Sequence, residues 1–130
     1  MKWIRIYLVA LMILFLHSSF TNGDIMISID VSPSVINLQN NGQVVTVHTD
    51  IKYSLVSGST VTLNGIEISW WKSDDRGFFV AKFQIDDIKN MPLNIGEYNT
   101  LTLSGITCDG VLFSGSQEVK VINVIPAGKK

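Results

Sequence analysis

The segment VVTVHTDI (44–51) carries the clearest structural signal in the chain. Its residues alternate between a mainly apolar set and a mainly polar set. The first set is Val45, Val47, Thr49 and Ile51, and the second is Val44, Thr46, His48 and Asp50. Side chains on a β-strand point alternately to opposite faces, so this pattern predicts a strand with one face in a core and the other in solvent.

Other short runs of alternating residues flank this segment, and turn residues separate them. The run IMISIDV (25–31) ends before Pro33, because proline cannot donate to a strand ladder. Tight turns are favoured by the Asn-Gly pair at 41–42 and the Asp-Gly pair at 109–110. The Asn-Gly pair at 64–65 predicts a bend or a β-bulge. This spacing of strands and turns is typical of an all-β domain.

One stretch, DDIKNMPLNIGE (86–97), lacks strand character. Ile85, Ile88 and Met91 have the spacing to line one side of a single helical turn at one end of the domain. The rest of the domain holds about seven to nine strands, which predicts an immunoglobulin-like antiparallel β-sandwich. The Cys…Trp…Cys framework of antibody domains is excluded, because the chain has one cysteine.

The N-terminal segment has the pattern of a secretory signal peptide. Lys2 and Arg5 precede an apolar run of 11 residues, 6–16. As a helix this run would span about 16 Å, roughly half of the hydrocarbon core of a bilayer. Small residues ending at Gly23 favour cleavage before Asp24, although Ser18 and Ser19 offer earlier positions. The alternative is an uncleaved signal anchor.

These patterns divide the chain into a signal peptide at 1–23, a β-sandwich at 24–125 and a polar tail at 126–130. We expect a protein that is secreted, periplasmic or on the cell surface, and that touches a membrane only through its first segment if that segment is not cleaved. The chain has 10 basic and 11 acidic residues and a net charge of −1. This balance supplies no basic surface for nucleic acid.

Cys108 is the only cysteine, so an exported form of the chain cannot close an internal disulfide. We expect Cys108 to be a small buried apolar residue in a strand. A disulfide between two chains is the alternative. A role as nucleophile is not expected, because no histidine is placed to activate it.

Several segments together resemble an immunoglobulin-like β-sandwich module that is common in exported proteins of archaea and bacteria. The resemblance covers most of residues 27–122. The matching positions are Asp30, Pro33, Asn37, Leu38, Val61, Leu63, Asn64, Gly65, Lys82, Phe83, Asp109, Gly110, Phe113, Gly115 and Ser116. They are turn and core residues, so they indicate a fold and not a chemistry.

The resemblance implies an accessory or repeat module of larger secreted proteins, without an activity of its own. This chain departs from the family pattern in carrying a single copy with no partner domain. Family members often have a longer acidic insertion before the strand that contains the Lys-Phe pair, and that insertion looks capable of holding calcium. Here it is shortened to KSDDRG (72–77), which argues against a metal site.

The segment ISWWKSDDRGFFVAKF (68–83) predicts a hairpin with two adjacent tryptophans. A four-residue loop, 74–77, places Trp70 opposite Ala81 and keeps the apolar residues of both strands on one face. A three-residue loop would place Trp70 opposite Lys82. Because a slip of one residue moves every side chain to the other face, we expect the four-residue loop.

In that register Trp70 lies in the core, and Trp71 lies on the outward face near Val80 and Phe78. Trp71 then packs on its cross-strand neighbours or offers a flat surface to a sugar or a protein. Trp71 and Phe78 are therefore the candidate ligand-binding residues.

No residue pattern predicts catalysis or a cofactor. The carboxylate pairs 74–75 and 86–87 fall at predicted turns, where Asp bonds its own backbone, and neither has the ligand pattern of a calcium loop. His48 has one carboxylate nearby, fewer than the three or four ligands of a metal site. Ser104 and Ser116 lie beside glycines, without a base for a catalytic triad. We expect no enzyme activity, no cofactor and no metal.

The leading hypothesis is an exported structural or interaction module whose partner is an unknown protein or a cell-surface glycan. Strand addition at an exposed sheet edge is one mode of contact. The alternative is a carbohydrate-binding module that uses Trp71, with Tyr53 or Tyr98. A calcium-stabilised adhesion module is a third hypothesis.

Overall fold

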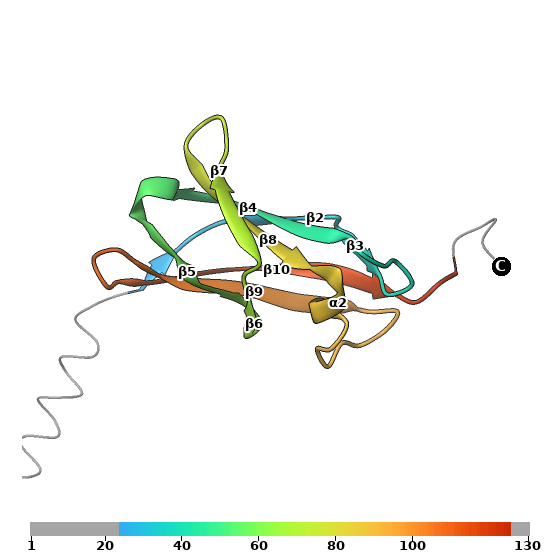
Figure 1. Cartoon of the computed structure of the whole chain (residues 1–130). Helices are drawn as coiled ribbons and strands as arrows, with labels where there is room; N and C mark the ends of the chain where they lie inside the picture. The colour runs from blue at the N-terminus through green and yellow to red at the C-terminus, as the bar shows by residue number, and fades with distance from the viewer. Residues whose placement is uncertain (1–23, 126–130) are drawn as a thin grey trace, which may run out of the picture.

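The computed structural model describes residues 24–125, which form two β-sheets in an open, sandwich-like arrangement (Figure 1). The expected signal peptide and polar tail lie outside the described residues. The six-stranded sheet contains β1 (Ile25–Met26), β3 (Val35–Asn37), β5 (Val56–Leu63), β6 (Ile66–Glu67), β9 (Tyr98–Thr107) and β10 (Leu112–Ile122). The four-stranded sheet contains β2 (Ile29–Ser32), β4 (Val44–Lys52), β7 (Trp70–Ser73) and β8 (Phe78–Gln84).

The first sheet has the order β1-β10-β9-β5-β6, with β3 also paired to β10, and the second has the order β2-β4-β8-β7. Most pairs are antiparallel, as the sequence predicts, but β1 and β3 run parallel to β10. The expected strand 25–31 is in fact two strands, because the chain leaves one sheet after β1 and joins the other at β2. This division raises the number of strands above the expected seven to nine.

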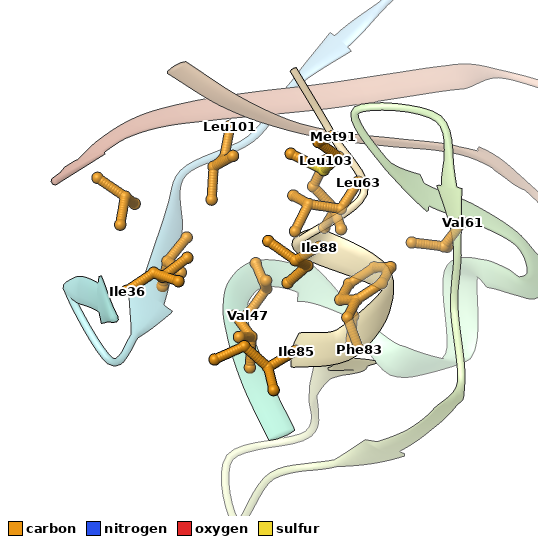
Figure 2. Packing of buried hydrophobic residues seen from close by; sticks show 14 of the residues in the cluster. Ile36, Val47, Val61, Leu63, Phe83, Ile85, Ile88, Met91, Leu101 and Leu103 are labelled. Carbon is orange, nitrogen blue, oxygen red and sulfur yellow. The ribbon is translucent and has the colours of Figure 1, made fainter. Parts of the chain in front are cut away.

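The core lies between the sheets and consists of the inward-facing residues of both (Figure 2). On β4 the residues Val45, Val47, Thr49 and Ile51 are buried, which confirms the alternation expected for this strand. Thr49 is the polar member of that set, and its hydroxyl donates to the carbonyl of Phe79 at 2.6 Å. The hydroxyl is therefore satisfied inside the core.

The short helix α2 (Ile85–Ile88) closes one end of the core. Ile85, Ile88 and Met91 are buried against both sheets, as their spacing predicts (Figure 2). Within residues 24–125 no helix is long and apolar enough to cross a membrane. A one-turn 3-10 helix, η1 (Tyr53–Leu55), links β4 to β5.

The crossing between β1 and β2 is held against β10. The backbone N–H of Ile27 donates to the carbonyl of Ser114 at 2.9 Å, and the side chain of Gln117 accepts from the N–H of Val31 at 2.8 Å. Gly115 lies inside this crossing, where a Cβ atom would be 2.5 Å from the carbonyl oxygen of Ile27. A glycine is required there because the neighbouring backbone leaves no room for a side chain.

We expect Gly115→Ala to lower the free energy of unfolding by about 1–3 kcal/mol, because the β1–β2 crossing must move away from β10. Ser116→Ala is the control, since Ser116 is exposed on the neighbouring position. Urea unfolding of both variants measures the difference. Equal stability of the two variants would show that the crossing adapts without cost.

Candidate interaction surface on the edge strand

The turn between β7 and β8 determines which faces their side chains occupy. The N–H of Asp74 donates to the carbonyl of Phe78 at 2.9 Å, and the N–H of Gly77 donates to the carbonyl of Asp74 at 3.0 Å. Gly77 has a φ of 87°, the left-handed conformation that follows a type I turn in a three-residue hairpin loop. The loop is therefore 75–77, and the expected four-residue loop is wrong.

The observed register pairs Trp70 with Lys82 and Trp71 with Ala81. The expected positions of the two tryptophans are thus exchanged: Trp70 shares the outward face with Lys82, and Trp71 shares the inward side with the buried Ala81. The expected pairings failed because residues 66–71 are not one strand. Ile66 pairs with Leu63 in the six-stranded sheet, and the chain changes sheets before β7 begins at Trp70.

Trp71 closes the gap between the two sheets at this edge. A Cβ atom added to Gly58 on β5 would lie 2.2 Å from the indole of Trp71, so the ring lies directly over that glycine. The side chain nevertheless remains 38% exposed. Gly58 therefore acts as a platform for the indole. Two serines flank this glycine, a composition typical of a loop, but Gly58 lies inside β5.

Trp70 lies on the outward face and is 45% exposed. The ammonium group of Lys82 lies 5.3 Å from the centroid of its ring, within the range of a cation–π contact, and donates to the hydroxyl of Thr46 at 2.8 Å. Burial of this ammonium, with a further contribution from the positive charge of Lys72, holds the pKa of Lys82 below its ordinary value of 10.5. Lys72, Trp70 and Lys82 thus form one cationic and aromatic surface.

Phe78 and Trp71, the two expected binding residues, lie on opposite faces of the hairpin. Phe78 is half-buried, and the guanidinium of Arg76 lies 5.5 Å from the centroid of its ring. On the same outward face Val80 is fully buried, because it lies in register between Lys72 of β7 and His48 of β4. The aliphatic stem of a lysine covers an apolar neighbour in this way.

One side of β7 has no partner strand among residues 24–125, because β7 is the last strand of its sheet. In an antiparallel pair, alternate residues direct their backbone N–H and C=O groups to the partner. The bond from Asp74 to Phe78 fixes this alternation, so Trp70 and Lys72 face β8. The backbone groups of Trp71 and Ser73 point to the open side.

Asp74 stabilises the turn that brings these residues together. Its carboxylate accepts the N–H groups of Phe78 at 2.9 Å and Arg76 at 2.8 Å. The hydrogen bond from Phe78 is the main cause that holds the pKa of Asp74 below its ordinary value of 3.8, and the Arg76 N–H and guanidinium lower it further. The expectation that this aspartate bonds its own backbone is confirmed.

The other expected residues lie elsewhere. Cys108 is exposed in the turn after β9, so the expectation of a buried strand residue is wrong; the strand ends one residue earlier, at Thr107. His48 is exposed on β4, as expected for a solvated strand residue. Tyr98 borders a hollow of about 340 Å³ together with Asn64 and Asn94, on the six-stranded sheet.

The remaining expected features lie outside β7 itself. Tyr53 stacks on the ring of Phe79 at 6.2 Å between centroids. Ser116 shares a hydrogen bond of 2.8 Å with Thr102, and Ser104 contacts Thr62 at 3.4 Å. Among residues 24–125, no three His, Cys, Asp or Glu side chains gather as a metal site.

Comparison of the chain with protein-family models finds no match, and comparisons with curated proteins and with solved structures find none either.

We expect Gly58→Ala to lower the free energy of unfolding by about 1–3 kcal/mol, because the methyl group displaces the indole of Trp71. In a Trp71→Ala background the same change should cost much less, since the ring is gone. Urea unfolding of the two single variants and the double variant measures this coupling. Strict additivity would contradict the contact between Gly58 and the indole.

Asp74 predicts a pH dependence of stability. Its folded pKa is lowered, so the carboxylate stabilises the fold above 3.8, its ordinary pKa, and this stabilisation is lost as the pH falls through the lower folded value. Asp74→Asn keeps the acceptor oxygen without the titration. Unfolding free energies are measured from pH 7 to pH 2. The free energy of unfolding should be higher for wild type than for the variant at neutral pH, and the two values should converge in acid. A gap that does not change with pH would contradict this role of the charge.

Proposed function

We propose that this chain is an exported, non-catalytic, immunoglobulin-like module that binds a protein partner through the edge strand β7. The observation that carries the proposal is the pair of adjacent, exposed tryptophans on a strand whose other side has no partner among residues 24–125. Such a module acts as a structural or interaction domain at the cell surface or outside the cell.

The strand order supports the immunoglobulin-like part of the proposal. Sandwiches of that class have one sheet of the first, second, fifth and fourth strands and another of the third, sixth and seventh. The order β2-β4-β8-β7 corresponds to the first sheet, and β5-β9-β10 to the second. The strand β6 beside β5 then corresponds to the additional strand of variable-type domains.

Export is supported by the sequence of residues 1–23, in which basic residues precede a short apolar run. The same pattern supports a secreted, periplasmic or surface location. The absence of a basic excess in the sequence argues against nucleic acid as the partner.

A protein partner is supported by the chemistry of β7. Strand addition uses the free backbone groups of an edge for affinity and neighbouring side chains for specificity. Trp71 and Ser73 supply the backbone groups, and Trp70 supplies an exposed indole beside Lys82. Tryptophan is among the residues that contribute most to binding at protein interfaces.

The alternative of a carbohydrate-binding module rests on the residual exposure of Trp71. A sugar-binding platform commonly needs ring faces that are open on one side of the domain. Trp70 and Trp71 lie on opposite faces of β7, and one face of the Trp71 ring lies on Gly58. This arrangement favours a protein partner over a glycan.

The test compares wild type, Trp70→Ala and Tyr98→Ala as immobilised baits. Tyr98→Ala is the matched control, because Tyr98 is an exposed aromatic on the other sheet. Surface and secreted proteins of the source organism are passed over each bait and quantified by mass spectrometry. We expect a set of proteins retained by wild type and Tyr98→Ala and reduced about tenfold or more on Trp70→Ala, the effect of losing about 1.4 kcal/mol.

Equal retention by all three baits would contradict binding of other proteins through β7. Insoluble polysaccharides provide a second arm with Trp71→Ala as the variant. Retention of wild type and loss of Trp71→Ala on a polysaccharide would establish the carbohydrate-binding alternative in place of the protein-binding proposal.

A further inference from the structure

We propose that the partner of β7 is β7 of a second copy of this chain, paired antiparallel about a two-fold axis at Trp71. This inference rests on the proposed function of β7 as an interaction edge and names the partner. Three properties of the strand lead to it: the direction of its backbone groups, the faces of its side chains and the position of Lys72.

The backbone groups limit which residues can pair. Hydrogen bonds to β8 occupy the backbone of Trp70 and Lys72, which leaves Trp71 and Ser73 with N–H and C=O groups on the open side. A strand added there must place its own open residues opposite these. Two copies of β7 satisfy this requirement when odd-numbered residues oppose odd-numbered residues.

The side-chain faces agree with that rule. Residues opposite each other in an antiparallel pair lie on the same face. Trp70 and Lys72 point outward and Trp71 points inward. When the two-fold axis passes through a residue of the strand, outward residues of one copy lie opposite outward residues of the other, and inward residues opposite inward residues. An axis between two residues would turn an indole of one copy toward the wrong face of the other.

Charge and length select among the remaining registers. An axis at Lys72 would place the two Lys72 side chains directly opposite each other in a closely spaced pair. An axis at Trp70 would pair residues 67 and 68 with β7 of the other copy, but that part of the chain belongs to the crossing between the sheets. An axis at Trp71 keeps Trp70, Trp71 and Lys72 of each copy opposite β7 of the other, with no like charges opposed.

In this register Lys72 lies opposite Trp70 of the second copy, and the contact occurs twice. Each Trp70 ring then has Lys82 of its own chain on one side and Lys72 of the second copy on the other, which extends the cation–π contact already present. Lys72 makes no ion pair within residues 24–125, so it is free for this contact. The two Trp71 rings meet on the inward side and bury each other's exposed surface.

The pairing joins two four-stranded sheets into one continuous sheet and covers an exposed edge of each copy. The interface is isologous, because the same strand of both copies forms it. The axis passes through a hydrogen-bonded pair, in which each Trp71 N–H donates to the carbonyl of Trp71 in the other copy.

The test is sedimentation velocity of residues 24–130, the chain expected after cleavage of the signal peptide, which contains the core described above. All variants carry Cys108→Ser, since Cys108 is an exposed free cysteine that would confuse the cross-linking test. Wild type and Lys72→Arg should form a concentration-dependent dimer. Lys72→Glu should weaken dimerisation by tenfold or more, and Lys52→Glu, the same charge change at an exposed residue of β4, should not. Urea unfolding of each variant establishes that all are folded.

A disulfide test reports the register. A mixture of the single variants Trp70→Cys and Lys72→Cys should cross-link to each other faster than Lys72→Cys cross-links to itself. The reverse order would overturn the proposed axis.

A wild type that stays monomeric up to about 1 mM would overturn the dimer. That result leaves the proposed function intact if the Trp70→Ala bait still retains less of the proteins that the wild-type bait retains. The converse result is that wild type forms the dimer while all three baits retain the same proteins. That result would contradict binding of other proteins through β7 and would leave the dimer inference standing.

Discussion

Closure of the two open edges between the sheets is the constraint on which the rest of this structure depends. A sandwich of two sheets buries its inward faces but leaves a gap along each side. On one side the chain itself closes the gap by crossing from β1 to β2 and back to β3, and Gly115 makes room for that crossing. On the other side the chain crosses between the sheets at residues 68–69, and beside this crossing the indole of Trp71 over Gly58 fills the gap.

Much of the fold follows from local patterns in the sequence. The alternation in β4 identified its buried residues, and Ile85, Ile88 and Met91 lie on the helical turn that their spacing indicated. The Asn64-Gly65 pair forms a tight two-residue turn between β5 and β6, where a bend or bulge was expected, because both residues adopt positive φ. These features depend on residues close together in the chain, which is why the sequence predicts them.

The candidate site was only partly predictable, and the reason lies in the chain between Leu63 and Trp70. The tryptophans themselves stood out, but the faces they occupy depend on where the chain leaves one sheet for the other. Alternation cannot be carried across such a crossing. The Asp-x-x-Gly turn held the better information, since Asp74 and Gly77 fit the three-residue loop. The role of Gly58 was missed because a glycine inside a strand also resembles a loop residue in the sequence. Its contact with the indole of Trp71 is visible only in the structure.

In the proposed pairing, Lys72 gives the edge strand both protection and selectivity. A charged residue in the middle of an exposed edge normally discourages pairing with other chains. Here the effect of Lys72 on pairing depends on which residue of the partner strand lies opposite it. A Trp70 ring attracts the ammonium group of Lys72, whereas a second Lys72 or a Lys82 repels it. Registers that oppose two lysines are disfavoured, and a strand that presents an aromatic residue opposite Lys72 is favoured. An apolar residue at this position would accept partners in many registers, so the lysine makes an edge with two tryptophans compatible with specific pairing and not with open-ended association.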